Sequence, residues 1–177
     1  MTRNETTMII AMLKTAYPSS FKDLTEEDAS ATVNLWQMIL ADEPFEDVKA
    51  AIVALVSTRT VGYSPTIGEV KEKLFQLRNP HERSETEAWA LVSRACRNGY
   101  YGYKEEFEKL PLDVQRAVGA PEVLRQWSQI PTDELETVTA SNFRKSYTTM
   151  QSRDREMAKI PMSVRLAAGA ALKELPE

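Results

Sequence analysis

The chain has 177 residues and a formal net charge of −4, and it contains one Cys and one His. One cysteine cannot form an intrachain disulfide, so folds stabilised by disulfides are excluded. One His with one Cys gives no zinc-ligand cluster of the usual spacing, so folds stabilised by a zinc ion are excluded as well. Because His is the commonest general base, the composition also disfavours catalysis, and an enzyme built on this chain would depend on carboxylates, Lys or Tyr.

Residues 1–5 lead directly into a periodic segment and lack the apolar core of a signal peptide. No stretch approaches the roughly 18 to 20 apolar residues of a membrane span. We therefore expect a cytoplasmic protein that is neither exported nor embedded in a membrane.

Apolar residues recur at three- and four-residue steps almost throughout, which predicts an all-α protein with no sheet. The first helix is expected from about Thr2 to Tyr17, because Pro18 cannot continue it. Thr25 caps a second helix that reaches about Ala41, and a third begins after Pro44. Thr66–Glu69 has the pattern of a capping box and opens the fourth. These four helices make an N-terminal helical bundle, residues 1–79.

The polar segment Asn79–Arg83 is the best candidate for a linker to a C-terminal helical region, residues 80–177. Ser84–Glu87 caps the first helix of this region, which we expect to end near Arg97. We interpret residues 97–103 as an aromatic turn, followed by short helices that prolines separate. A long helix from about Thr132 to Lys159 and a last one from about Met162 to Leu175 complete the prediction.

Tyr100, Tyr101 and Tyr103 form a cluster beside two glycines. Tyrosines have an apolar ring and a polar tip, so the cluster suits a protein interface or a stacking platform for single-stranded nucleic acid. The structural alternative is that the rings fill a gap between helices. Of the remaining rings, Trp36 is expected in the core, and Trp89 and Trp127 in the core of the second region or at an interface.

The segment from Arg144 to Arg165 holds six basic residues against two acidic ones: Arg144, Lys145, Arg153, Arg155, Lys159 and Arg165. Such a segment suits contact with an acidic protein surface or with phosphate. The structural alternative is a solvated helix flank with charge pairs three or four residues apart. A protein partner is favoured over DNA, because only about six dispersed charges are available.

Sites for small-molecule chemistry are not recognisable in the chain. It has neither a phosphate-binding loop of the G-x-x-x-x-G-K-[ST] type nor a dinucleotide-binding glycine motif. Acidic pairs such as Glu26–Glu27 lie at expected helix starts, where compensation of the helix dipole explains them. Cys96 is expected to be a small core residue and His81 a solvated linker residue. We expect no catalytic residues, no cofactor and no metal.

The N-terminal half resembles the family of phage proteins that load and inhibit the replicative helicase. The matching segments are Tyr17–Pro18, Phe21–Asp23, Asn34–Trp36, Ala50–Ala51 and Tyr63–Lys71. The second half is similar to the longer prophage members of that group, in the segments Glu87–Trp89, Arg97–Gly102, Glu105–Phe107, Leu110–Pro111, Ala117–Gly119, Leu124–Trp127 and Ser141–Tyr147. The resemblance covers most of residues 1–155.

The resemblance implies a non-enzymatic accessory protein of phage DNA replication. Family members are small, acidic and helical; they bind a hexameric DnaB-type helicase, hold it inactive and deliver it to an origin-bound replisome organiser. In that family the C-terminal part engages the helicase, partly by folding on contact. The second half of this chain is longer and better patterned than a short disordered tail.

Partner contact is therefore expected in the C-terminal region, which holds eight of the 14 aromatic residues. The candidate contact residues are Trp89, Arg97, Tyr100, Tyr101, Tyr103, Trp127, Arg144, Lys145, Arg153 and Arg155. On this hypothesis direct binding to nucleic acid is weak or absent. The alternative hypothesis is a DNA-binding replication or regulatory protein that uses the basic segment 144–165.

Overall fold

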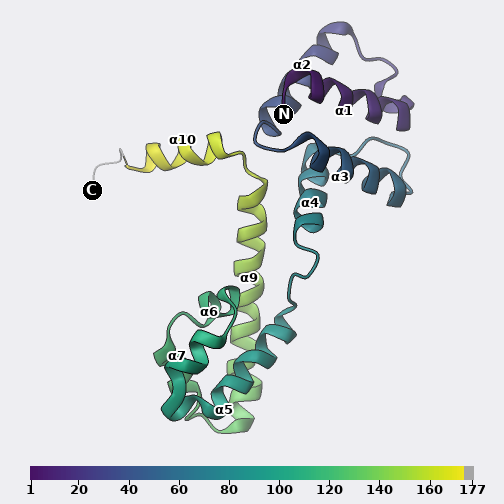
Figure 1. Cartoon of the computed structure of the whole chain (residues 1–177). Helices are drawn as coiled ribbons and strands as arrows, with labels where there is room; N and C mark the ends of the chain where they lie inside the picture. The colour runs from purple at the N-terminus through teal and green to yellow at the C-terminus, as the bar shows by residue number, and fades with distance from the viewer. Residues whose placement is uncertain (174–177) are drawn as a thin grey trace. The chain divides into compact units, whose positions relative to one another are not determined.

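The computed structural model describes residues 1–173, and within this range the chain is helical and has no strand (Figure 1), which confirms the all-α prediction. Contacts divide the chain into two compact units. Unit 1 comprises Met1–Pro80 and the segment that begins at Arg155, and unit 2 comprises His81–Asp154. Each unit is described separately below.

Unit 1 begins with four helices and a short 3-10 turn. They are α1 (Arg3–Ala16), the turn η1 (Pro18–Phe21), α2 (Glu26–Ile39), α3 (Phe45–Thr58) and α4 (Ile67–Arg78). Three of the helices start with a complete capping box, at Thr2, Thr25 and Thr66. In each box the threonine hydroxyl accepts the backbone N–H three residues on, and the acidic side chain there accepts the threonine N–H. The cap at Thr25 and the capping box at Thr66 were both expected from the sequence.

The core of unit 1 forms where α1 packs on α2 and α3 and where α3 packs on α4. Its buried members include the residues whose helical spacing predicts a core: Ile9, Leu13, Val33, Trp36, Leu40, Val48, Ile52, Leu55, Val70 and Leu74. The same helical spacing places Ala16 and Leu77 on the buried side, but both are exposed. Both lie in the last turn of their helix.

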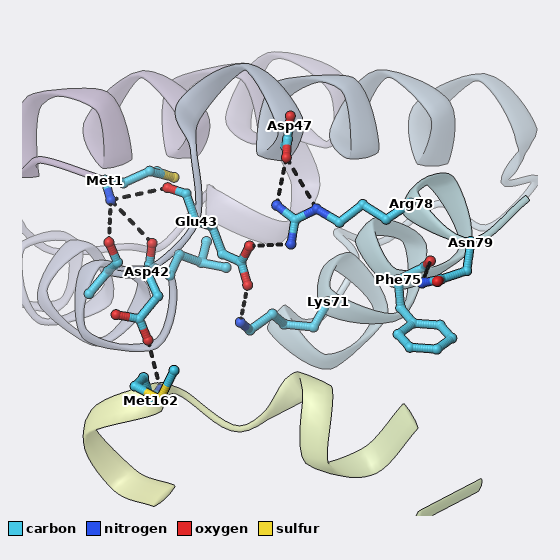
Figure 2. A network of polar contacts seen from close by, with 11 residues as sticks. Met1, Asp42, Glu43, Asp47, Lys71, Phe75, Arg78, Asn79 and Met162 are labelled. Atoms are coloured by element: carbon cyan, nitrogen blue, oxygen red, sulfur yellow. Dashed lines mark hydrogen bonds and ion pairs between the residues drawn. The ribbon is translucent and has the colours of Figure 1, made fainter. Parts of the chain in front are cut away.

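The C-terminal segment of unit 1 contains the end of α9 (Ala140–Lys159) and α10 (Met162–Lys173). Lys159 and Arg155 both form ion pairs with Glu72 of α4. The first turn of α10 is held by Asp42, whose Oδ2 accepts the backbone N–H of Met162 at 2.7 Å (Figure 2). Residues 174 and 175, which end the predicted last helix, lie outside the described residues.

Unit 2 is built from α5 (Glu85–Lys109), α6 (Leu112–Val118), α7 (Pro121–Trp127), α8 (Thr132–Glu134), one turn of π-helix η2 (Leu135–Thr139) and most of α9. A capping box at Ser84 and Glu87 starts α5, as expected. α5 packs on α6 and α7. The core contains Ala88, Trp89, Val92, Leu110, Val114, Leu124, Leu135, Phe143 and Tyr147.

The segment 97–103, expected as an aromatic turn, is instead a kinked part of a helix. α5 runs through it to Lys109, but Gly102 has non-helical backbone angles, φ −97° and ψ 25°, and the helix kinks there. Gly99 serves close packing instead of a turn: a Cβ there would lie 3.4 Å from Ser128 Cβ and 3.5 Å from the Leu124 carbonyl oxygen. The segment holds no proline, so nothing in it removes a helical hydrogen bond.

The long helix expected from Thr132 is present but not uniform, since α8 passes through the π-turn η2 into α9. The apolar spacing of this helix predicts one broad buried side, with Leu135, Val138, Phe143, Tyr147, Met150 and Met157. Leu135, Phe143 and Tyr147 are buried, but Val138 and Met157 are 58% and 49% exposed. Val138 lies in the π-turn, which adds a residue to one helical turn and so changes which side of the helix faces α5. Met157 belongs to the part of α9 in unit 1.

Candidate functional site

Trp89 and Trp127 belong to an aromatic cluster in the core of unit 2. The ring centroid of Trp89 lies 6.2 Å from that of Trp127 and 5.5 Å from that of Phe143, which stacks on Tyr147 at 5.8 Å. Trp89 is 3% exposed, and Trp127 is half-buried. These rings therefore pack in the core of unit 2, under its surface residues.

The expected tyrosine cluster lies at the surface. Tyr101 is 90% exposed and Tyr100 47% exposed, and their rings meet edge to face at 4.6 Å. Tyr103 is half-buried, with the Arg125 guanidinium 5.6 Å and the Lys104 ammonium 5.9 Å from its ring centroid. Tyr100 and Tyr101 do not fill a gap between helices, so both rings are available to a partner.

Arg97 and Arg144, 47 residues apart in sequence, meet at a hollow of about 400 Å³ on unit 2. Two further lining residues, Arg94 and Glu136, were not among the sequence candidates. The spacing of three between Arg94 and Arg97 places both on one side of α5, and this signal could have identified Arg94. Glu136 reaches the hollow only because η2 packs beside α5, which no local pattern indicates.

Glu136 is held by two neutral donors from α5. Its Oε1 accepts the Ser93 hydroxyl at 2.6 Å, and its Oε2 accepts the Trp89 indole N–H at 2.9 Å. These hydrogen bonds, with the more distant charges of Arg144 and Arg97, lower the pKa of the Glu136 carboxyl. Nearby, burial raises the pKa of the Cys96 thiol to about 11. Cys96 is therefore a protonated core residue at neutral pH, as expected from the sequence.

The remaining basic candidates are divided between the two units. Lys145 and Arg153 are exposed on the unit 2 part of α9. Arg155 belongs to unit 1, where its guanidinium lies 5.5 Å from the Phe75 ring centroid and pairs with Glu72. The basic segment expected from the sequence is thus not assembled in one unit.

Unit 1 contains a polar network around Glu43, shown in Figure 2. Glu43 and Lys71 are buried and form an ion pair, and Arg78 bridges Glu43 and Asp47 at 2.8 Å and 2.6 Å. Burial opposes ionisation of Glu43, but the hydrogen bonds from Lys71 and Arg78 outweigh it and lower the pKa of the carboxyl. Asp47 and Arg78 are more exposed, so the network reaches the surface.

A second hollow, of about 540 Å³, lies between α1 and α3 of unit 1. Its lining is apolar and includes the exposed side chains of Met8, Val53 and Val56. The spacing of apolar residues does not indicate this groove, because Met8, Val53 and Val56 lie outside the helix faces that form the core. An exposed apolar groove between two helices is typical of surfaces that receive another protein.

The described part of the chain is all-helical, and its surface includes exposed tyrosines, arginines and an apolar groove. Aromatic residues and arginines are enriched at protein interfaces, so these features are typical of the class of helical proteins that bind other proteins. Within residues 1–173 no helix is both long and apolar enough to cross a membrane. The same described residues contain no group of His, Cys, Asp and Glu that could hold a metal ion.

Residues 1–71 match the family model of the N-terminal domain of the helicase loader and inhibitor of phage SPP1. The match supports the resemblance found in the sequence and covers the first four helices as far as Lys71 in α4. That family has an accessory, non-catalytic role and interacts with the replicative helicase. No curated protein and no solved structure matches the chain.

Proposed function

We propose that the protein is a non-catalytic accessory factor of phage DNA replication that binds the replicative helicase, inhibits it and helps to load it at an origin through an origin-binding organiser. The observation that carries this proposal is the family match over residues 1–71. We place its action in the cytoplasm of the bacterial host. Direct binding to nucleic acid is not part of the proposed role.

A protein of this kind acts through differential binding. It changes the activity of a helicase only if it binds one state of the helicase more tightly than another. The surface proposed for this contact is on unit 2, with Tyr100, Tyr101 and Tyr103 as aromatic anchors. Arg97, Arg144, Lys145 and Arg153 would add cationic contacts around them. Trp89 and Trp127, which pack together in the core of unit 2, would act by holding this surface in place. Arg155, which belongs to unit 1, stays a candidate for a separate cationic contact.

An unwinding assay tests the proposal. The host's hexameric replicative helicase is given a forked DNA substrate and ATP, and the full-length protein is added in increasing amounts. We expect unwinding to fall to a plateau at a fixed ratio of protein to helicase, with no shift of the DNA by the protein alone. Undiminished unwinding at saturating protein would contradict the proposal. A salt-sensitive shift of DNA by the protein alone would instead favour the DNA-binding alternative.

A further inference from the structure

The hollow on unit 2 has the lining of an anion-binding site. Arg94 and Arg97 of α5 and Arg144 of α9 surround it, with Ser93, Trp89 and Glu136 completing its wall. Every one of these residues belongs to unit 2. Arg94 and Arg97 are exposed and Arg144 is half-buried, so an incoming group can reach all three guanidinium groups.

The charges in this hollow are unbalanced. Three guanidinium groups face one carboxylate, which leaves a surplus of two positive charges. Both oxygens of Glu136 already accept hydrogen bonds from Ser93 and Trp89. Among the described residues, no side chain forms a hydrogen bond or a close ion pair with any of the three arginines. The Nε of Arg144 is moreover buried without an acceptor, and a buried donor of this kind normally has one.

Guanidinium groups bind carboxylates through paired N–H···O hydrogen bonds, and such charge-assisted bonds are the strongest that side chains form. We propose that this hollow receives the carboxylate side chains of an acidic segment of the partner protein. Glu136 keeps its fixed position, and the incoming carboxylates supply the acceptors that the three arginines lack. The inference rests on the proposed function only in taking the partner to be a protein.

An acidic protein segment fits this site better than a nucleic acid does. Unit 2 as a whole holds ten Lys and Arg residues against twelve Asp and Glu residues, so its net charge of −2 repels a polyanion that runs along the surface. Binding to a DNA backbone depends on many phosphate contacts spread along a groove or stripe. The positive surplus here is confined to one hollow that has room for a few side chains.

Fluorescence anisotropy of a labelled peptide rich in Glu tests the inference directly on the full-length protein. We expect the peptide to bind in a salt-dependent way and the same peptide with Gln in place of Glu not to bind. The double variant Arg97→Gln and Arg144→Gln should weaken binding at least about tenfold, because it removes two charge-assisted contacts. Arg116→Gln removes the same kind of charge from α6 outside the hollow, where Arg116 pairs with Asp154 at the surface, and should leave affinity within about twofold.

Several results would overturn the inference. They are equal binding of the Gln peptide, equal weakening by Arg116→Gln, or tighter binding of an oligo-dT strand that the double variant abolishes, which would make the hollow a phosphate site. Circular dichroism melting of each variant shows that the fold is retained. If the helicase binds wild type and double variant equally well, this inference fails and the proposed function stands. If the wild type binds the peptide and not the helicase, the proposed function fails and the anion site stands.

Discussion

The stability of unit 1 depends on a buried ion pair between Glu43 and Lys71. Both side chains are buried, at 9% and 5% exposure, and each is the other's compensating charge. A buried ion pair contributes little net free energy when intact, but removal of one partner leaves an uncompensated charge in the interior. The pair therefore makes unit 1 sensitive to changes at position 43.

We predict that Glu43→Gln lowers the free energy of unfolding by about 3 kcal/mol, because the Lys71 ammonium then stays buried without a counter-charge. Urea unfolding followed by circular dichroism measures it. Glu46→Gln is the matched control: Glu46 pairs with Lys49 at the surface, with both side chains well exposed, and its loss should change stability by less than about 1 kcal/mol. Equal effects of the two substitutions would contradict the assignment.

The same carboxylate predicts a pH dependence. The pKa of Glu43 is below its ordinary value of 4.5 in the folded protein, and so are those of Glu69 and Glu72. Below about pH 4.5 the unfolded chain therefore binds more protons than the folded one, and the stability that these groups contribute is lost as pH falls through the folded pKa values. Urea midpoints should fall steeply from about pH 5 toward about pH 3. Glu43→Gln should flatten this slope, and an unchanged slope would contradict the pKa assignment.

A substitution at Tyr101 can test partner binding without disturbing the folded state. Its ring is 90% exposed, so Tyr101→Ala should leave the thermal unfolding midpoint unchanged. If the tyrosines anchor the helicase, the same substitution should weaken helicase binding about tenfold or more, the effect typical of an aromatic hot spot. Leu112→Ala, at an exposed apolar residue of unit 2, is the control and should bind as the wild type does. Loss of affinity in both variants would argue against a specific role for Tyr101.

At the scale of elements, sequence prediction succeeds where the signal is local. The capping boxes at Thr25, Thr66 and Ser84 are each set by two residues three apart, and the structure has all three. The course of α5 is set by longer-range packing, because Gly99 lies against α7. A glycine next to a tyrosine cluster has the same local appearance whether it makes a turn or admits a neighbouring helix.

Because Gly99 lies against α7, a larger side chain at this position should disturb the packing of α5. Gly99→Leu should destabilise the protein by about 1 to 3 kcal/mol, because the new side chain meets Leu124 and Ser128 of the adjacent helix and its C-terminal end. A Cβ at Gly102 meets only a Glu105 carboxylate oxygen at 3.9 Å, so Gly102→Ala should change stability by less than about 1 kcal/mol. Urea unfolding compares the two, and a milder effect at position 99 than at 102 would overturn the packing role.

At the scale of the whole molecule, the helical class and much of both cores follow from the spacing of apolar residues. The assembled surface does not follow from it. Arg97 and Arg144 come together with Glu136 only through the packing of α5, η2 and α9. The segment 144–165 reads as one basic region along the chain, yet Arg144 and Arg155 lie in different units. Periodicity indicates which side of a helix is buried, but not which helix covers it.

If this chain works by binding the replicative helicase, as proposed, the two proteins form a stable complex that size-exclusion chromatography with light scattering detects. The purified full-length protein is mixed with the host helicase at micromolar concentration and loaded on the column. We expect one peak that contains both proteins, with a mass above that of the helicase hexamer alone. Two independent peaks at tens of micromolar, each with the mass of one protein alone, would contradict it.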